Sequence, residues 1–172
     1  MTLEARGTIE DSAVVLTTGV VVKRMPGFRI AYVEHRGPYD EIGFAFQRLL
    51  RSLRERHLHG AGPMIAIRPR EPDPEEDSRR NAEAAVSVSQ EFKGESELRC
   101  RELPPADVAS LIYEGPPGRY PAAIELVRDW LVDHELVAVG PMREVYSRDL
   151  SELPPGILYL EIQQPFRRKG GG

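Results

Sequence analysis

The sequence Gly140-Pro141-Met142-Arg143-Glu144-Val145-Tyr146 places one carboxylate inside a segment that otherwise has the composition of a buried strand. Gly140 and Pro141 are typical of a turn before that strand. Because side chains alternate between the two faces of a strand, Met142, Glu144 and Tyr146 share one face. A glutamate in this place is either a solvated charge, as most glutamates are, or a charge directed at a ligand.

The same stretch has a counterpart earlier in the chain. Gly62-Pro63-Met64 corresponds to Gly140-Pro141-Met142, and Gly37-Pro38 corresponds to Gly115-Pro116, since 140 − 62 and 115 − 37 both give 78. Further residues match at the same offset, so the two halves align without a gap. Repeated matches at one offset predict a duplicated module of roughly 75–80 residues.

Hydrophobic periodicity predicts the order strand, helix, strand, strand in each module. The first module has a short β-rich run over residues 20–24, then predicted strands over 28–35, 63–68 and 83–92, with a helix over 39–56. The second has predicted strands over 107–113, 141–148 and 157–164, with a helix over 120–134. We therefore predict an α+β fold with antiparallel sheets, in which two modules pack about a pseudo-twofold axis and leave a central ligand cleft.

The domain prediction follows from these ranges. Residues 1–19 show no clear period and are predicted to be an N-terminal extension. The domain covers residues 20–166, with module one at 20–92 and module two at 100–166. Residues 68–80 are charged and rich in proline, which predicts a solvated loop, and residues 167–172 form a basic tail.

Composition excludes several classes of protein. The net charge of −4 argues against a general nucleic-acid binder, which needs a basic surface. The single cysteine, Cys100, cannot form an intramolecular disulfide and indicates a reducing compartment, so we expect a cytoplasmic protein. No apolar run has the length of a membrane helix, so no membrane contact is predicted. No cluster of metal ligands or phosphate-binding glycine motif occurs, so we predict no metal and no cofactor.

Several motifs carry a family resemblance. They are Pro104-x-x-x-Val108-Ala109, Gly115-Pro116, a helix ending near Trp130-Leu131, the stretch 140–146, and a closing strand with Glu161-Ile162 and Pro165. Together they resemble the GyrI-like small-molecule-binding domain, which is also the effector-binding domain of multidrug-responsive transcription regulators and has the SOUL/GyrI-like fold. The resemblance covers about residues 20–166.

The resemblance implies a site for bulky hydrophobic and often cationic aromatic compounds in the cleft between the two modules. The family's central glutamate corresponds to Glu144 and its companion aromatic to Tyr146, while Glu161 matches an acidic position. Tyr39 and Trp130 match recurrent aromatics of the family. Two further ligand-binding candidates are Tyr113 and Tyr120. Tyr120 departs from the family, which usually has an aliphatic residue there, and Pro117 stands at the repeat position of Tyr39.

The alternative for each of these aromatic residues is a place in the hydrophobic core. For Trp130, which lies on a predicted helix, the core is the favoured alternative. An aromatic ring can offer its face to a cation, so the two alternatives stay open.

Three functions stay open. The first is a stand-alone domain that binds aromatic small molecules, with Glu144 as the central carboxylate. The second is a hydrolase of reactive cyclopropane-bearing genotoxins, as in some GyrI-like proteins, with Glu144 and Tyr146 as catalytic residues. The third is a partner of another protein, as in gyrase-inhibiting relatives. Since only about 20 residues precede the first module, no helix-turn-helix fits there, and we expect no sequence-specific DNA binding.

Overall fold

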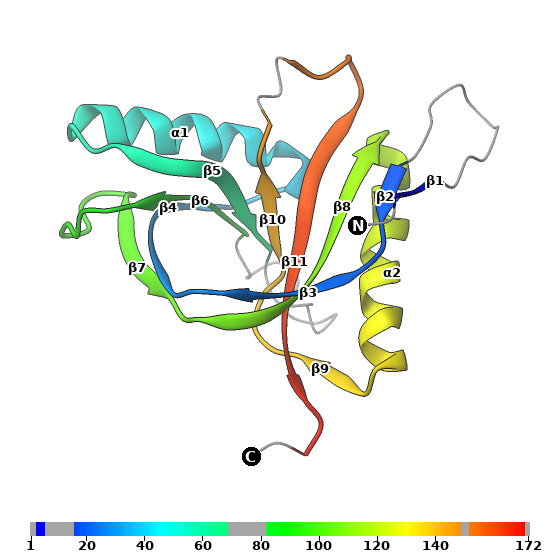
Figure 1. The fold of residues 1–172 in the computed structure, drawn as a ribbon. Helices are drawn as coiled ribbons and strands as arrows, with labels where there is room; N and C mark the ends of the chain where they lie inside the picture. Colours follow the sequence, from blue (N-terminus) through cyan, green and yellow to red (C-terminus); the bar gives the residue numbers. More distant parts are fainter. Residues whose placement is uncertain (1–2, 6–15, 69–81, 149–151, 171–172) are drawn as a thin grey trace. The chain divides into compact units, whose positions relative to one another are not determined.

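The structure is a computed structural model that describes residues 3–5, 16–68, 82–148 and 152–170 (Figure 1). It confirms the α+β class, with helices and antiparallel strands. Contacts divide the chain into two units. The middle unit comprises residues 26–105 and 141–144, and the terminal unit comprises residues 1–25, 106–140 and 145–172.

The middle unit is an antiparallel sheet that carries one helix. Its strands are β4 (Phe28–His35), β5 (Gly60–Ile67), β6 (Ala82–Val88) and β7 (Arg99–Leu103), in the order β5-β6-β4-β7. The helix α1 (Ile42–Glu55) follows a short 3-10 helix, η1 (Tyr39–Glu41), and packs on β4 and β6 (Figure 1). Its buried residues recur every three or four positions, as an amphipathic helix requires: Ile42, Ala45, Leu49 and Leu53.

The terminal unit is built around the long antiparallel pair β8 (Ala106–Gly115) and β11 (Leu158–Arg168). The strand β3 (Val21–Met25) also pairs with β8. The 3-10 helix η2 (Pro117–Arg119) leads into α2 (Tyr120–Asp133), which packs on β8. Fully buried side chains of β8, β11 and α2 form the core of this unit: Val108, Leu111, Tyr113, Val127, Leu160 and Ile162.

Four strands were not predicted. One is β7, which pairs with β4, and the other three have three residues each. The extension contains β1 (Leu3–Ala5) and β2 (Leu16–Thr18), and β9 (Leu136–Ala138) pairs with the end of β11. β2 pairs with β8, where the Thr18 hydroxyl accepts a hydrogen bond from the Ile112 amide at 2.9 Å. A three-residue strand has no readable period, and an exposed sheet edge recruits it through unpaired backbone groups.

Predicted boundaries differ from the observed ones by a few residues. β11 runs to Arg168, two residues into the range predicted as a tail, because its end pairs with β9. β6 ends at Val88, so residues 89–92 lie outside the strand that was predicted over 83–92. Of the predicted loop, residues 69–80 lie outside the described part of the chain.

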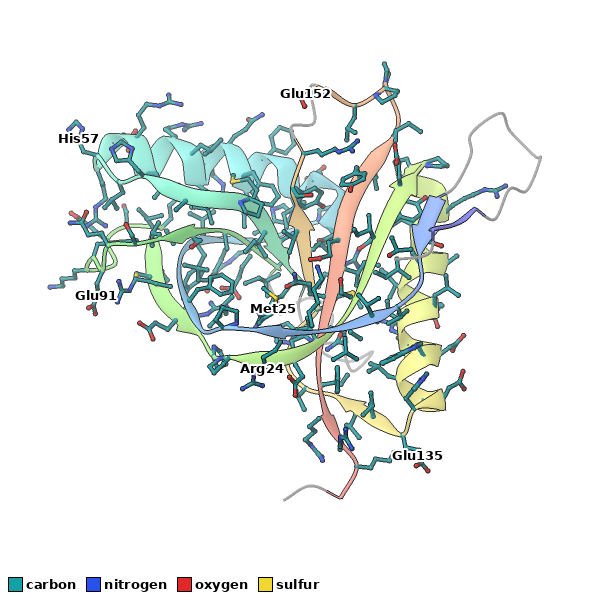
Figure 2. The ribbon with its side chains drawn as sticks, viewed as in Figure 1. Arg24, Met25, His57, Glu91, Glu135 and Glu152 are labelled. Atoms are coloured by element: carbon teal, nitrogen blue, oxygen red, sulfur yellow. The ribbon has the colours of Figure 1, made fainter. Side chains whose placement is uncertain are left out.

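Several local features recur at the predicted offset of 78. Both helices have 14 residues, and Ile42 and Tyr120 begin them. His57 and Glu135 lie just beyond the two helices (Figure 2). Their φ angles are 55° and 56°. A left-handed residue at this position commonly ends a helix. These features agree with a duplicated module, and the superposition of the two halves stays a prediction.

Candidate functional site

Glu144 belongs to β10 (Arg143–Tyr146), which neighbours β5. The amide of Arg68, directly after β5, donates a hydrogen bond to the carbonyl of Met142 at 2.9 Å. The Glu144 side chain is 1% exposed. Glu144 is therefore no solvated charge on a strand, and its role toward a ligand stays a prediction.

Two side chains of the middle unit contact the Glu144 carboxylate. The hydroxyl of Tyr39, from η1, donates a hydrogen bond to Oε1. Nε of Arg68 lies 3.1 Å from Oε2, and the Arg68 guanidinium carbon lies 4.1 Å from the centroid of the Tyr39 ring. The three side chains thus form a compact cluster, which we call the Glu144 cluster.

Burial raises the pKa of the Glu144 carboxyl to about 8. Removal from water disfavours the charged form of a carboxyl, whereas a nearby guanidinium favours it. The Arg68 side chain is 30% exposed, so water weakens its attraction for the carboxylate. Desolvation is therefore the larger effect, and Glu144 exchanges its proton near neutral pH.

Arg143, the neighbour of Glu144 in β10, is a second buried charge that the sequence did not indicate. It is 4% exposed, and its Nη1 has no hydrogen-bond partner among the described residues. Its guanidinium lies 5.9 Å from the Phe28 ring centroid, and burial, with repulsion from Arg101, lowers the pKa of Arg143. Arg101, in contrast, pairs with both carboxylate oxygens of Glu83.

Apart from Glu144 and Tyr39, the predicted site residues belong to the terminal unit. The Tyr113 and Tyr120 rings meet edge to face, with centroids 5.3 Å apart. The Tyr113 hydroxyl donates to the Pro116 carbonyl, and burial raises the pKa of Tyr113. Both tyrosines are buried, and their contacts are typical of a core.

Trp130 stacks on His134 at 4.1 Å between ring centroids and meets Phe166 edge to face at 6.5 Å. Trp130 thus has partners within its own unit.

Tyr146, at the end of β10, is half-buried.

Glu161 is held in a polar network on β11. It accepts hydrogen bonds from Lys23 at 2.8 Å, from Ser110 at 3.2 Å and from Gln163 at 2.6 Å. These three donors, all from the terminal unit, satisfy the carboxylate without a ligand.

Arg68 is the member of the Glu144 cluster that sequence reasoning missed. The prediction placed it at the end of a strand, next to a charged loop. The repeat contained a usable signal, because 146 − 68 is also 78 and Arg68 therefore occupies the repeat position of Tyr146. This correspondence with a predicted site aromatic is the signal that identifies Arg68 as a candidate site residue.

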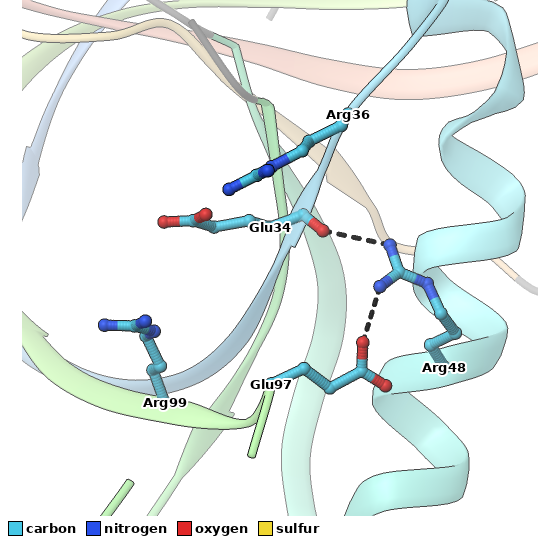
Figure 3. Close-up of a pocket in the computed structure, with 5 residues that line it drawn as sticks. All are labelled: Glu34, Arg36, Arg48, Glu97 and Arg99. Atoms are coloured by element: carbon cyan, nitrogen blue, oxygen red, sulfur yellow. Dashed lines mark hydrogen bonds and ion pairs between the residues drawn. The ribbon is translucent and has the colours of Figure 1, made fainter. Parts of the chain in front are cut away.

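A separate pocket of about 340 Å³ lies in the middle unit (Figure 3). Only charged residues line it: Glu34, Arg36, Arg48, Glu97 and Arg99. Arg48 connects two sides of the pocket. It donates hydrogen bonds to the Glu34 carbonyl at 2.9 Å and to the Glu97 carboxylate at 2.6 Å. The lining holds no aromatic ring, so the pocket is unlike a site for an aromatic compound.

Two absences apply to the described residues. Within them, no three or more His, Cys, Asp and Glu side chains gather in a way that could hold a metal ion. Neither helix found there is both long enough and apolar enough to cross a membrane.

Comparison with solved structures shows the fold. EcmrR in the EcmrR–DNA complex of EcmrR-RPo has a TM-score of 0.77 at 14% identity, over 88% of this chain and 58% of that one. This chain thus spans little more than half of that protein. The EcmrR C-terminal domain has a TM-score of 0.70 at 15% identity, over 87% of this chain and 97% of that one.

Two further solved structures share the fold. A hydrolase from Listeria innocua has a TM-score of 0.61 at 11% identity, over 87% of this chain and 92% of that one. SAV2435 bound to tetraphenylphosphonium has a TM-score of 0.54 at 13% identity, over 87% and 94%. No curated protein matches the chain.

The family comparison covers nearly the whole domain. The model of the GyrI-like small molecule binding domain matches residues 19–167, one residue beyond each predicted domain boundary. The chain therefore belongs to the GyrI-like small-molecule-binding domain family.

Proposed function

We propose that this chain binds organic cations that carry aromatic groups, with Glu144 as the counter-charge. The observation that carries the proposal is the Glu144 cluster, in which a buried carboxylate and the face of the Tyr39 ring already surround a guanidinium. A carboxylate and an aromatic face are the two groups that attract a large organic cation. The family match and the tetraphenylphosphonium bound to SAV2435 support the choice of ligand class.

The aromatic residues of the terminal unit stay proposed ligand contacts. These are Tyr113, Tyr120, Trp130 and Tyr146. Glu161 stays a proposed second carboxylate, although its three donors favour a structural role.

The first prediction concerns the charge of Glu144. Tetraphenylphosphonium and the uncharged triphenylphosphine oxide are titrated calorimetrically into wild-type protein and Glu144→Gln at pH 9. We expect the variant to lose about 30-fold to several-thousand-fold in affinity for the cation, because truncating one member of a buried charge pair costs about 2–5 kcal/mol. The neutral compound should bind both proteins with similar affinity.

Wild-type affinity for the cation should also depend on pH. Only the ionised carboxylate attracts the cation, and with a pKa of about 8 it is a minor species at pH 6. Because the apparent affinity scales with the competent fraction, we expect binding at pH 6 to be weaker than at pH 9 by up to about 100-fold, and by no more than Glu144→Gln loses.

Two control variants sharpen this test. Glu125→Gln removes an exposed carboxylate of α2 that pairs with Arg128, and it should leave both affinities unchanged. Glu161→Gln removes the alternative counter-charge. If Glu161→Gln lost the cation and Glu144→Gln did not, the assignment of Glu144 would be wrong.

Hydrolysis is a second candidate function, favoured by the pKa of Glu144. A carboxyl with a pKa of about 8 is suited to accept and return a proton near neutral pH, and the Tyr39 hydroxyl orients it. The proposed substrates are aromatic compounds with a reactive cyclopropane ring.

Turnover is the measurement that separates the two functions. We expect wild-type protein to convert such a compound to its water adduct, detected by mass spectrometry. Glu144→Gln should reduce the rate by about 100-fold or more, since general acid–base catalysis contributes that much. Substrate that binds and stays intact with wild-type protein would exclude hydrolysis of that compound.

A further inference from the structure

The guanidinium of Arg68 is placed where a bound cation would be expected. Its central carbon lies 4.1 Å from the Tyr39 ring centroid, and its Nε lies 3.1 Å from Oε2 of Glu144. The other carboxylate oxygen accepts the Tyr39 hydroxyl. An arginine of the chain itself therefore makes the two contacts that would hold an organic cation.

The Arg68 side chain starts from a fixed backbone position and reaches toward water. Arg68 directly follows β5, and its backbone is fixed by the hydrogen bond from its amide to Met142. The side chain is 30% exposed, whereas that of Glu144 is 1% exposed. A long side chain with its head near water can turn outward at low cost, because water then solvates the charge.

The ion pair with Glu144 and the contact with the Tyr39 ring are both of a kind that another cation can make. Water weakens a partly exposed ion pair and a partly exposed cation–π contact. A large aromatic cation buries more apolar surface against the protein than a guanidinium does, so it can replace Arg68 with a net gain.

We propose that Arg68 is an internal competitor of the cationic ligand, so that its guanidinium occupies the place beside Glu144 and Tyr39 and leaves when an organic cation binds. Arg68 thereby sets the charge preference of the site, since a neutral aromatic compound gains nothing from its removal. This inference rests on the proposed cation-binding function.

The test compares the wild type with Arg68→Gln at pH 9. Tetraphenylphosphonium and triphenylphosphine oxide are titrated calorimetrically into both proteins, and thermal unfolding confirms that both are folded. We expect Arg68→Gln to bind the cation about ten-fold more tightly, which corresponds to about 1.4 kcal/mol, and to bind the neutral compound with unchanged affinity. Arg68→Lys keeps a positive charge at this position and should bind the cation more weakly than Arg68→Gln.

Arg148 provides a matched control outside the Glu144 cluster. Its guanidinium carbon lies 4.3 Å from the Tyr159 ring centroid in the terminal unit, so it makes the same kind of contact with a different ring. Arg148→Gln should leave the affinity for tetraphenylphosphonium unchanged, which separates local competition from a general change in net charge.

Each alternative result has a distinct meaning. If Arg68→Gln bound the cation no more tightly while Glu144→Gln lost it, the competitor role would be wrong and the proposed function would stand. Weaker cation binding by Arg68→Gln would mean that Arg68 positions the carboxylate, which also overturns the competitor role. If neither the wild type nor Arg68→Gln bound the cation, both the inference and the proposed function would fail.

Discussion

Glu144→Gln is expected to remove a large part of the pH dependence of folding. The pKa of the carboxyl is about 8 in the folded protein, against an ordinary value of 4.5. Between pH 4.5 and 8 the unfolded chain has already released this proton, whereas the folded protein still holds it. The free energy of unfolding of the wild type should therefore fall as pH rises through this window, by about 4–5 kcal/mol from this one group.

Glutamine keeps the shape of the protonated glutamic acid and cannot ionise. The difference in the free energy of unfolding, variant minus wild type, should therefore grow by about 4–5 kcal/mol between pH 4 and pH 9. Urea denaturation at intervals of one pH unit measures this difference, and groups that titrate equally in both proteins cancel from it.

Glu125→Gln is the control for this measurement, because Glu125 is exposed on α2 and its side chain is 59% accessible. Its curve should run parallel to that of the wild type. If the Glu144→Gln curve also ran parallel, the Glu144 carboxyl would ionise at an ordinary pH, and the burial argument would not hold.

The fold followed from the sequence where elements are long enough to show a period. The 14 residues of α1 and the eight residues of β4 contain several repeats of their apolar pattern, and β4 has the predicted bounds. The strands β1, β2 and β9 have three residues each, so pairing with a neighbouring strand, not local pattern, determines them.

The Glu144 cluster was predictable in part. Glu144 and Tyr39 came from motifs, and the structure places them in contact although they are far apart in sequence. Arg68 could not be inferred from local pattern, because its role depends on which side chains surround the end of β5. Arg143 could not be inferred for another reason. Strand alternation puts Arg143 and Glu144 on opposite faces, yet both residues are buried.

Arg143→Met is expected to stabilise the protein. Methionine has a similar length and no polar hydrogen, so it fills the same space without a buried charge. Among the described residues nothing hydrogen-bonds Nη1, and an unsatisfied buried donor costs about 1–3 kcal/mol. We expect the free energy of unfolding to rise by about that amount, and the midpoint of thermal unfolding to rise by about 3–10 °C for a chain of this size.

Arg101→Met is the matched variant with the opposite expected sign. Arg101 makes two hydrogen bonds to Glu83 and lies over the Tyr32 ring at 4.3 Å. Removing it leaves the Glu83 side chain, which is 18% exposed, without this partner. Because the Arg101 side chain is itself 34% exposed, we expect a modest loss of about 1–2 kcal/mol.

Urea and thermal unfolding of both arginine variants show whether local contacts or net charge cause the change in stability. Both substitutions remove one positive charge and add the same side chain, so an effect of net charge alone would move them together. Opposite changes would show that the partner of each guanidinium determines its contribution to stability. If Arg143→Met instead lost stability, the Arg143 guanidinium would have a compensating anion in solution, and binding of chloride or phosphate to the wild type would be the measurement that identifies it.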